Sequence, residues 1–447
     1  MKRLITLALA VLLGAFTFIA PAFVRAESTA APAATPETRT NDAKAIYLKT
    51  IRGTVMFLCR HADGTATQGS GWVIDCQRKL IVTNHHVIKG AKEIVVVFPE
   101  FRNGRPIAEQ SHYVNMRELG EASASKRLNG QKLADFMIHG HSVRGYVLDA
   151  DVQHDLAIVE VDALPAGTVA LPLADESLMP GEKTHAIGGN SGSGQAMWVY
   201  ISGTVRSVYQ RHAKFKDGSV QARMIESESA VIPGDSGGPV VNDAGEVVGV
   251  TQSIEGVASF SVEVSELKTF LKAIQNVIHP ETAQEFLARA QRRLPYADYV
   301  LAIDDLSEAI ELNDELVEAY VTRGAIYNEI GQPKKAILDF DMALQLNEKD
   351  PRSWGGLASA KSKLGKYSAA ISDIAKALAL APGNHVLLEI RAIAREGNQE
   401  FAKALVDYLR LSQMHKNNAK NYAFFTKKVE ELTDKLSDIK LLKSEGD

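Results

Sequence analysis

The sequence predicts a multidomain protein in which an all-β domain is followed by an all-α domain. Between Gly53 and about Val264, short runs rich in Val, Ile and aromatic residues alternate with turns containing Gly, Asn, Asp or Pro. After Val264 the strand pattern stops, and the remaining sequence is helix-like and rich in Ala, Leu, Glu and Lys. A chain of 447 residues is also long for one domain, so two or three are expected.

Composition excludes several classes of protein. Hydrophobic residues make up 45% of the chain and charged residues 23%, which is typical of a soluble globular protein. The net charge is −4 and no block is strongly basic, so we expect no nucleic-acid partner. The two cysteines, Cys59 and Cys76, are spaced unlike a metal site, and we expect neither a metal nor another cofactor.

The first residues predict a secretory signal peptide over residues 1–26. The basic pair Lys2-Arg3 precedes the apolar run Leu4–Ala20, and Val24-Arg25-Ala26 has small or compact residues at the positions that a signal peptidase reads. An uncleaved membrane anchor is the alternative, but the run is short for a span and is broken by a glycine. No later stretch is apolar enough to span, so we expect a periplasmic or secreted protein without a membrane span after cleavage.

Residues 27–40 are rich in Ala, Pro, Thr and Glu and are predicted to be a flexible lead-in. A short helix is expected over Asn41–Ile51. The β-type runs that follow have few helices between them, which favours antiparallel barrels or a sandwich. They are Thr54–Cys59, Gly71–Asp75, Leu80–Thr83, Glu93–Phe98, Leu156–Val161, Val199–Val208, Met224–Glu226, Val247–Val250 and Ser259–Val264.

A long polar insertion, residues 102–144, interrupts this rhythm. Its centre, Val114–Ile138, has the composition of a helix. Long insertions in compact domains usually have a function or a structure of their own, but the sequence assigns no role to this one. A helix is expected over Glu266–Ile278, where His279-Pro280 ends it.

The C-terminal half repeats with a period of 34 residues. Small and large apolar residues recur in register, as at Ala302, Ala336, Ala370 and Ala404, and at Leu306, Phe340, Ile374 and Tyr408. This pattern resembles the tetratricopeptide repeat over residues 281–415, followed by a capping helix and tail over 416–447. A generic helical bundle would not hold several positions to one period. Stacked repeats form a concave groove, so we expect a protein partner there. In the first repeat Arg293 stands where an aromatic residue is usual.

A serine in a glycine-flanked turn, Val231 to Pro239, is the candidate nucleophile. Glycines on both sides of Ser236 allow a sharp turn that exposes the hydroxyl, and the amides of Gly234 and Ser236 can form an oxyanion hole. Alone, the pattern also fits the nucleophile elbow of α/β-hydrolases or an incidental hairpin turn.

The partners of such a serine are found at the ends of two apolar strands. The run Leu80–Thr83 leads directly into His85-His86, and Asp155 immediately precedes the run Leu156–Val159. The order His86, Asp155, Ser236 is that of chymotrypsin and differs from that of the hydrolase elbow.

Three motifs carry a family resemblance: Thr83-Asn84-His85-His86-Val87, His154-Asp155-Leu156-Ala157 and Gly234–Pro239. Together they resemble the trypsin-like serine proteases, and more closely their bacterial HtrA/Deg branch, over about Val55–Leu271. The resemblance implies two packed six-stranded β-barrels within a protease domain of residues 41–278. It also implies that the base is His86 and not His85. In these roles His86 takes the proton of Ser236, and Asp155 orients His86.

Two features depart from the HtrA/Deg pattern. Asp235 replaces the usual asparagine before the serine, and tetratricopeptide repeats stand where a PDZ domain is usual. The residue six before the serine, which sets specificity in trypsin-like enzymes, is Ala230, next to Val231. A pocket lined by these residues favours small or medium aliphatic side chains, while Glu226 and Glu228 leave a partly acidic pocket open.

The sequence leaves open whether the two cysteines form a disulfide or stay as free thiols. A hairpin around Gly64 would place Cys59 opposite about Gly71 and Cys76 nearer Thr54, which argues against a disulfide.

The sequence therefore predicts an exported serine endopeptidase whose repeats recruit substrates or regulators. The alternative is a partner-binding repeat protein with a latent or inactive protease domain. Esterase or acyl-transferase chemistry, which uses the same three residues, also stays open.

Overall fold

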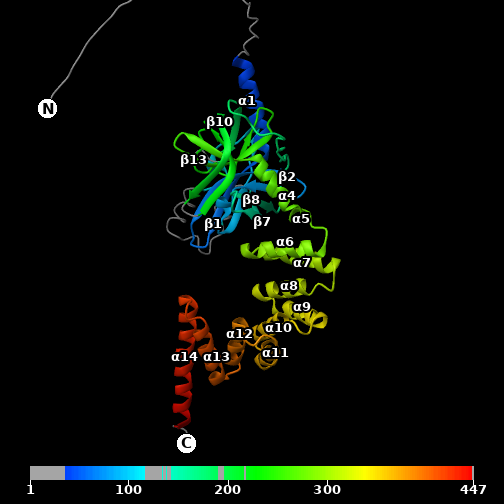
Figure 1. Cartoon of the computed structure of the whole chain (residues 1–447), viewed down its shortest axis with the longest axis vertical. Helices are drawn as coiled ribbons and strands as arrows, with labels where there is room; N and C mark the ends of the chain where they lie inside the picture. The colour runs from blue at the N-terminus through cyan, green and yellow to red at the C-terminus, as the bar shows by residue number, and fades with distance from the viewer. Residues whose placement is uncertain are drawn as a thin grey trace, which may run out of the picture.

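The computed structural model describes residues 36–115, 133, 137, 142–189, 196–215 and 218–444 (Figure 1). The expected signal peptide, the first part of the lead-in and most of the centre of the 102–144 insertion lie outside the described residues. Within the described ranges, no helix combines the length and apolarity needed to cross a membrane.

The first barrel closes from strands in the order β1-β2-β3-β8-β7-β4, all paired antiparallel. Its strands are β1 (Thr54–His61), β2 (Ala66–Asp75), β3 (Leu80–Thr83), β4 (Ala91–Val97), β7 (Ser142–Asp151) and β8 (Leu156–Val161). Between β4 and β7 the described part of the insertion holds a separate two-stranded sheet of β5 (Phe101–Arg102) and β6 (Arg105–Pro106).

The second barrel closes in the order β10-β11-β14-β13-β12-β9. Its strands are β9 (Lys183–Gly188), β10 (Val199–Phe215), β11 (Gly218–Ser227), β12 (Pro239–Val241), β13 (Val247–Glu255) and β14 (Ala258–Glu263). Two closed barrels, each with six described strands, confirm the predicted double-barrel fold.

Strand β1 shows why the barrels pack together. Val55, Phe57 and Cys59 point into the interior of the first barrel, whereas Met56 and Leu58 pack in a second cluster with Ile187 and Trp198 from the other barrel. Because both faces of this strand are buried, its sequence is apolar throughout instead of alternating.

Helices flank the barrels at both ends of the domain. Helix α1 (Pro36–Thr50) begins five residues before the expected Asn41 and includes the end of the segment that composition predicts to be flexible. Its Tyr47 hydroxyl donates to the Trp198 carbonyl oxygen at 2.9 Å, which attaches the helix to the second barrel. Helices α4 (Val264–Ala273) and α5 (Gln275–Ile278) lead out of β14 toward the C-terminal half.

The C-terminal half is an array of helix pairs, as the 34-residue period predicts (Figure 1). Every alanine of the series 302, 336, 370 and 404 is completely buried. The fourth pair, the weakest in sequence, is formed, and the tail is one helix. The helices are α6 (Ala283–Arg293), α7 (Tyr299–Leu312), α8 (Val317–Glu329), α9 (Pro333–Leu346), α10 (Pro351–Lys363), α11 (Tyr367–Leu380), α12 (His385–Gly397), α13 (Phe401–Met414) and α14 (Ala419–Ser444).

A second 34-residue series, which sequence analysis missed, is ionic. Each pair buries one aspartate of its second helix against an arginine or lysine of its first helix. The series is Asp305 with Arg289 and Arg293, Asp339 with Arg323, Asp373 with Lys361, and Asp407 with Arg391 and Arg395. A buried charge without its partner is costly, so each ion pair favours one register of its two helices.

The first repeat is attached to the first barrel by Arg293. This side chain is only 1% exposed, and its guanidinium contacts Asp305 at 2.7 Å and Glu160 of β8 at 2.8 Å. The neighbouring Arg292 pairs with Asp149 of β7, and Tyr296 packs against the apolar interior of the barrel. The position that departs from the repeat pattern in sequence is therefore the one that joins the two domains.

Candidate active site

His86 is positioned by the end of a completely buried strand. Strand β3 runs into the short helix α2 (His85–Ile88), which carries both neighbouring histidines. Asn84, between strand and helix, donates from its side-chain amide to the Asp155 carbonyl oxygen at 2.8 Å. Because this bond ties the β3 end to the turn before β8, the base and the acid are held by the same rigid corner.

Asp155 binds the histidine at two points. The carboxylate of this residue, which is 3% exposed, accepts the His86 backbone N–H at 2.9 Å and lies 2.7 Å from His86 Nδ1. A carboxylate only accepts hydrogen bonds, so we assign the ring proton to Nδ1, which leaves Nε2 to act as the base. Asp155 holds this geometry with a left-handed backbone, φ 57°.

Ser236 lies in a turn that needs glycine on both sides. Gly234 has φ 107° and Gly237 has φ 89°, values that favour glycine. A Cβ on Gly237 would also lie 2.2 Å from the Ser70 carbonyl oxygen. Ser70 fixes the turn from the first barrel, since its N–H donates to the Ser236 carbonyl at 2.8 Å and its hydroxyl donates to the Gly234 carbonyl at 2.7 Å.

Gln252, which sequence analysis missed, links the serine to the acid. The Ser236 hydroxyl donates to the Gln252 carbonyl oxygen at 3.1 Å, and the Gln252 side-chain amide donates to Asp155 Oδ2 at 3.3 Å. The structure thus brings the three predicted residues to one site between the barrels. In it the serine hydroxyl is directed to Gln252 rather than to His86. No motif marks a lone glutamine within a strand, so the sequence carries no signal for it.

The predicted oxyanion donors are available. Among the described residues, the N–H groups of Gly234 and Ser236 have no acceptor in the protein. The bond from the Ser70 hydroxyl to the Gly234 carbonyl oxygen fixes the turn that carries these amides. Amides without an acceptor can bind an oxygen that develops negative charge.

Asp235 is buried beneath the turn. This residue is 2% exposed, and its Oδ2 accepts the Ile232 N–H at 2.9 Å, whereas its Oδ1 has no partner among the described residues. Burial raises the pKa of the Asp235 carboxyl to about 6. The carboxyl packs so tightly on Gly188 that a Cβ there would lie 1.8 Å from Oδ1.

A cavity of about 460 Å³ opens beside His86, between His85 and Lys89 of the first barrel and Val220 and Ser253 of the second. The predicted pocket residues do not line it. Val231 packs into the interior of the second barrel with Ile225 and Val248, and Ala230 is exposed.

The two glutamates considered for the pocket are also directed elsewhere. Glu226 bonds the Tyr209 hydroxyl at 3.2 Å and approaches Arg206 at 3.5 Å, and Glu228 lines a separate cavity with Lys183. The glutamates would share a face with Ala230 only if this stretch were a regular strand, but β11 ends at Ser227.

The cysteines are free, as the hairpin argument predicts: Cys59 is buried and Cys76 is exposed. The predicted pairing within the hairpin was wrong, because Cys59 lies opposite Thr67 and not opposite Gly71. The hairpin turns nearer to Cys59 than expected. Burial raises the pKa of the Cys59 thiol to about 12, so this thiol stays protonated at neutral pH.

Comparison with known proteins identifies the two domains. Residues 69–250 match the trypsin-like peptidase domain, and residues 317–350 and 351–384 match the tetratricopeptide repeat. The chain contains a trypsin-like peptidase domain joined to tetratricopeptide repeats.

The curated relatives of the peptidase domain are HtrA/Deg-type serine proteases. The chain is 30% identical to serine protease HhoA of Synechocystis, over 48% of this chain and 43% of the relative. It is 25% identical to a periplasmic serine endoprotease of DegP type from Halomonas elongata, over 43% of this chain and 31% of the relative. The match thus spans less than half the length of each relative.

Among solved structures, the active form of the Rv3671c protease from M. tuberculosis is similar at 19% identity, with a TM-score of 0.38. The match covers 57% of this chain and 93% of the Rv3671c chain. The fold assignment rests instead on the strand order of the two barrels.

Proposed function

We propose that the chain is an exported serine endopeptidase that cleaves peptide bonds of protein substrates through Ser236, His86 and Asp155. The observation that carries the proposal is the double contact of Asp155 with the His86 backbone and ring, opposite a serine on a glycine turn. This arrangement orients one imidazole nitrogen toward the carboxylate and leaves the other for the serine proton.

Catalysis begins when the Ser236 hydroxyl leaves the Gln252 carbonyl and donates its proton to His86 Nε2. Breaking the 3.1 Å bond requires the serine side chain to rotate, and such rotations are fast compared with turnover. The serine oxygen then attacks the substrate carbonyl, whose oxygen becomes negative and accepts from the amides of Gly234 and Ser236.

The tetrahedral intermediate collapses when His86 donates its proton to the leaving amine, which breaks the peptide bond and leaves an acyl ester on Ser236. A water molecule, deprotonated by His86, then hydrolyses this ester and restores the serine. Throughout, the Asp155 carboxylate stabilises the imidazolium through the 2.7 Å contact at Nδ1.

We assign the enzyme to the periplasm or the extracellular space. The basic-apolar leader of residues 1–26 supports export, and the name of the Halomonas relative places that relative in the periplasm. The repeats, which resemble modules that bind proteins, would recruit a substrate or regulator.

One observation favours a second function, a repeat protein with a latent protease domain. The Ser236 hydroxyl is bonded to the Gln252 carbonyl and not to His86, which is the arrangement of a site at rest. A ligand of the repeats would then have to shift this equilibrium by binding the active arrangement more tightly.

The test is labelling of the purified mature chain with a fluorophosphonate, alongside digestion of unfolded casein. Labelling and cleavage by the wild type that are both lost in Ser236→Ala would support the endopeptidase. Labelling without cleavage of any protein would favour esterase chemistry. A folded wild type that neither labels nor cleaves would contradict the endopeptidase and favour the latent domain.

A further inference from the structure

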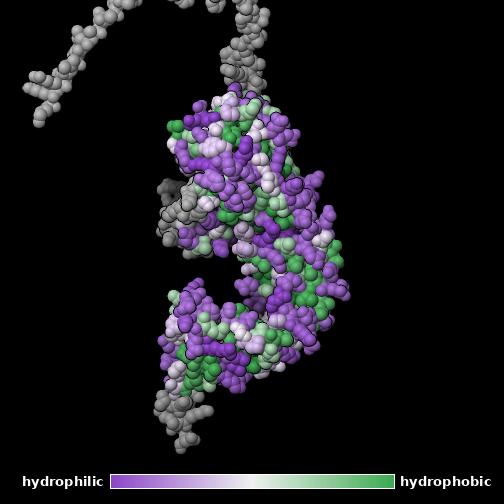
Figure 2. All heavy atoms as spheres, in the orientation of Figure 1, coloured by the Kyte–Doolittle hydropathy of each residue, from purple (hydrophilic) through white to green (hydrophobic). Residues whose placement is uncertain are grey.

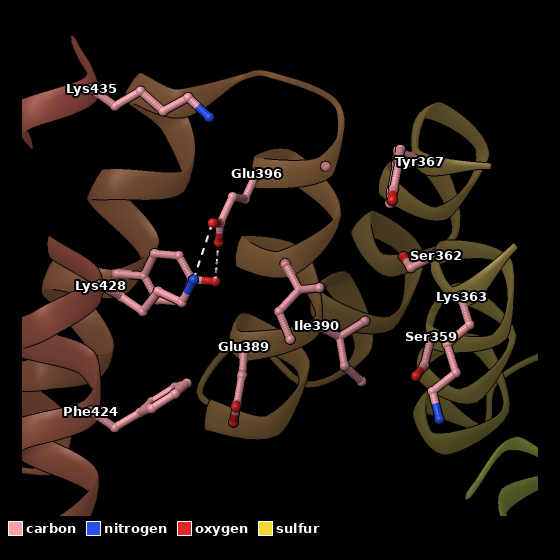
Figure 3. A pocket seen from close by; sticks show the side chains of 13 residues that line it. Ser359, Ser362, Lys363, Tyr367, Glu389, Ile390, Glu396, Phe424, Lys428 and Lys435 are labelled. Atoms are coloured by element: carbon pink, nitrogen blue, oxygen red, sulfur yellow. Dashed lines mark hydrogen bonds and ion pairs between the residues drawn. The ribbon is translucent and has the colours of Figure 1, made fainter. Parts of the chain in front are cut away.

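A cavity of the C-terminal half lies between two first helices of the array, α10 and α12, and the terminal helix α14. It has a volume of about 650 Å³ and is lined from α10, α12 and α14 (Figure 3). The space-filling view shows that this part of the molecule is hollowed where the array curves back toward the peptidase domain (Figure 2). Since two residues of its lining, Ile393 and Phe424, are about half exposed, a partner can reach the cavity from solvent.

Apolar side chains in this cavity are exposed to an unusual extent. Ile393 is 49% exposed and Phe424 is 51% exposed, and Ile390 also belongs to the lining. Large apolar side chains gathered in a hollow mark a binding surface more often than scattered ones do. They indicate that the occupant presents an apolar side chain of its own.

The charges in the lining favour an acidic occupant. Lys428 and Lys435 project from α14 on one wall and Lys363 from α10 on the other (Figure 3). Lys428 is neutralised by Glu396 at 3.1 Å. Lys363 donates to the Asn328 carbonyl oxygen, and Lys435 lies 4.1 Å from the centre of the Phe401 ring. Neither of these two has a carboxylate partner in the part of the chain that the structure describes.

The acidic residues of the lining offset this charge only in part. Glu396 is already engaged, because it accepts from both Lys428 and the Tyr408 hydroxyl at 2.8 Å. Glu389 is the other carboxylate of the lining. The lysine charges thus outweigh the single available carboxylate.

One polar group in the wall also lacks a partner. Ser362 is nine-tenths buried, and its hydroxyl forms no hydrogen bond with any described residue. A buried hydroxyl without a partner costs free energy, which a ligand carbonyl or amide would relieve. A polypeptide supplies all three features together: an apolar side chain, side-chain carboxylates and backbone polar groups.

We propose that this cavity binds an acidic polypeptide segment, in which aspartate or glutamate residues flank a large apolar side chain. The inference rests on the proposed role of the repeats in recruiting a protein partner, and it names the chemistry of that partner. The apolar residue would contact Ile393 and Phe424, and the carboxylates would pair with Lys435 and Lys363.

The experiment measures peptide binding to the full mature chain carrying Ser236→Ala, so that no peptide is cleaved. Three fluorescein-labelled 12-residue peptides, blocked at both ends, are compared by fluorescence anisotropy. The first alternates leucine with aspartate, the second replaces aspartate by lysine, and the third replaces leucine by serine. We expect the first to bind at least about tenfold more tightly than the others, and more weakly as salt is raised.

Matched variants locate the binding. Lys435→Glu and Ile393→Ser should each weaken the first peptide by about tenfold, as expected for residues at the centre of a contact. Two control variants change residues outside the cavity: Lys427→Glu, on the same helix as Lys435, and Val406→Ser, at an exposed residue. Both should bind the first peptide as tightly as the parent does. Circular dichroism of each variant establishes that the helices are formed.

Equal binding of the aspartate and lysine peptides would overturn the proposal, as would equal losses in the lining and control variants. Sedimentation that shows a dimer, lost on Phe424→Ser, would overturn it in favour of a second copy of this chain. Binding is measured in the Ser236→Ala variant, so it does not depend on peptidase activity. A failure of fluorophosphonate labelling would contradict the proposed activity but not the proposed peptide binding.

Discussion

The guanidinium of Arg293 lies 2.8 Å from the carboxylate of Glu160, a contact between the first repeat and the strand that begins next to Asp155. Arg293 is also held by Asp305 on α7. One buried cation is thus shared by both domains, and it makes the position of the first repeat depend on β8.

The Arg293 contacts predict a large loss of stability when this side chain is removed. Arg293→Met would leave Asp305 buried beside Arg289 alone and release Glu160, and we expect a loss of about 3 kcal/mol. Urea unfolding followed by circular dichroism would measure it, in the Ser236→Ala background to prevent autolysis. Lys427→Met is the control, because its exposed pair with Glu431 should contribute less than about 1 kcal/mol. Equal losses in both variants would contradict this account of the domain junction.

The contact of Asp155 with His86 predicts a loss of activity without a loss of fold. In Asp155→Asn the side-chain amide would donate to His86 Nδ1 and force the ring proton onto Nε2, the nitrogen that must act as base. We expect kcat to fall on the order of 10⁴-fold, as in the chymotrypsin template. Hydrolysis of a fluorogenic casein substrate measures it, and an unchanged melting temperature separates chemistry from folding. Retention of most of the activity would mean that Asp155 is not the residue that orients the base.

The buried carboxyl of Asp235 predicts a pH-dependent stability. Its pKa is raised by burial from 3.8 to about 6. Because the folded state binds this proton more tightly than the unfolded state does, the contribution to stability is full below about pH 4. It is lost as the pH rises through 6, and it amounts to about 3 kcal/mol.

Asp235→Asn would remove this contribution, since the amide has no proton to lose. The difference in unfolding free energy between variant and parent should therefore grow in favour of the variant from pH 4.5 to pH 7.5. Urea titrations at four pH values, both in the Ser236→Ala background, would measure it. A difference that is the same at every pH would show that this carboxyl has the same pKa in the folded and the unfolded protein, and that burial does not raise it.

The packing of Asp235 on Gly188 predicts that no side chain is tolerated at that glycine. Gly188→Ala would place a methyl group against Oδ1 and displace the serine turn, with a loss of about 2 kcal/mol and of most activity. Thermal unfolding and fluorophosphonate labelling measure the two effects. Gly383→Ala, where nothing lies within 4 Å of the added methyl, should be neutral. In the double variant Gly188→Ala with Asp235→Ala, the shorter side chain at position 235 should relieve the clash. If the losses of stability of the two single variants simply add in the double variant, the clash is refuted.

The parts of the fold that sequence reasoning could predict are those with a repeating physical cause. Burial of one face every 34 residues fixes the positions of Ala302 and Ala336, and an apolar strand that ends in a polar turn marks His86. These features depend on neighbours along the chain, which the sequence displays directly.

The parts that it could not predict depend on neighbours far along the chain. Gln252 is an ordinary strand residue until the second barrel closes and sets it between Ser236 and Asp155. Spacing from the serine predicts Val231 in the pocket, but spacing does not reveal which way a loop residue faces. The repeated aspartates are typical of exposed helix positions in sequence, and only the paired helices show that each one is buried against a cation.

Those aspartates have a consequence for the evolution and engineering of the chain. Because the second, third and fourth helix pairs each contain their own ion pair, at Asp339, Asp373 and Asp407, one of these pairs can be duplicated or deleted without leaving a buried aspartate of another pair without its cation. The array can therefore be lengthened or shortened in steps of 34 residues. The number of repeats sets the position of the last helix, and of any partner bound there, relative to the peptidase domain.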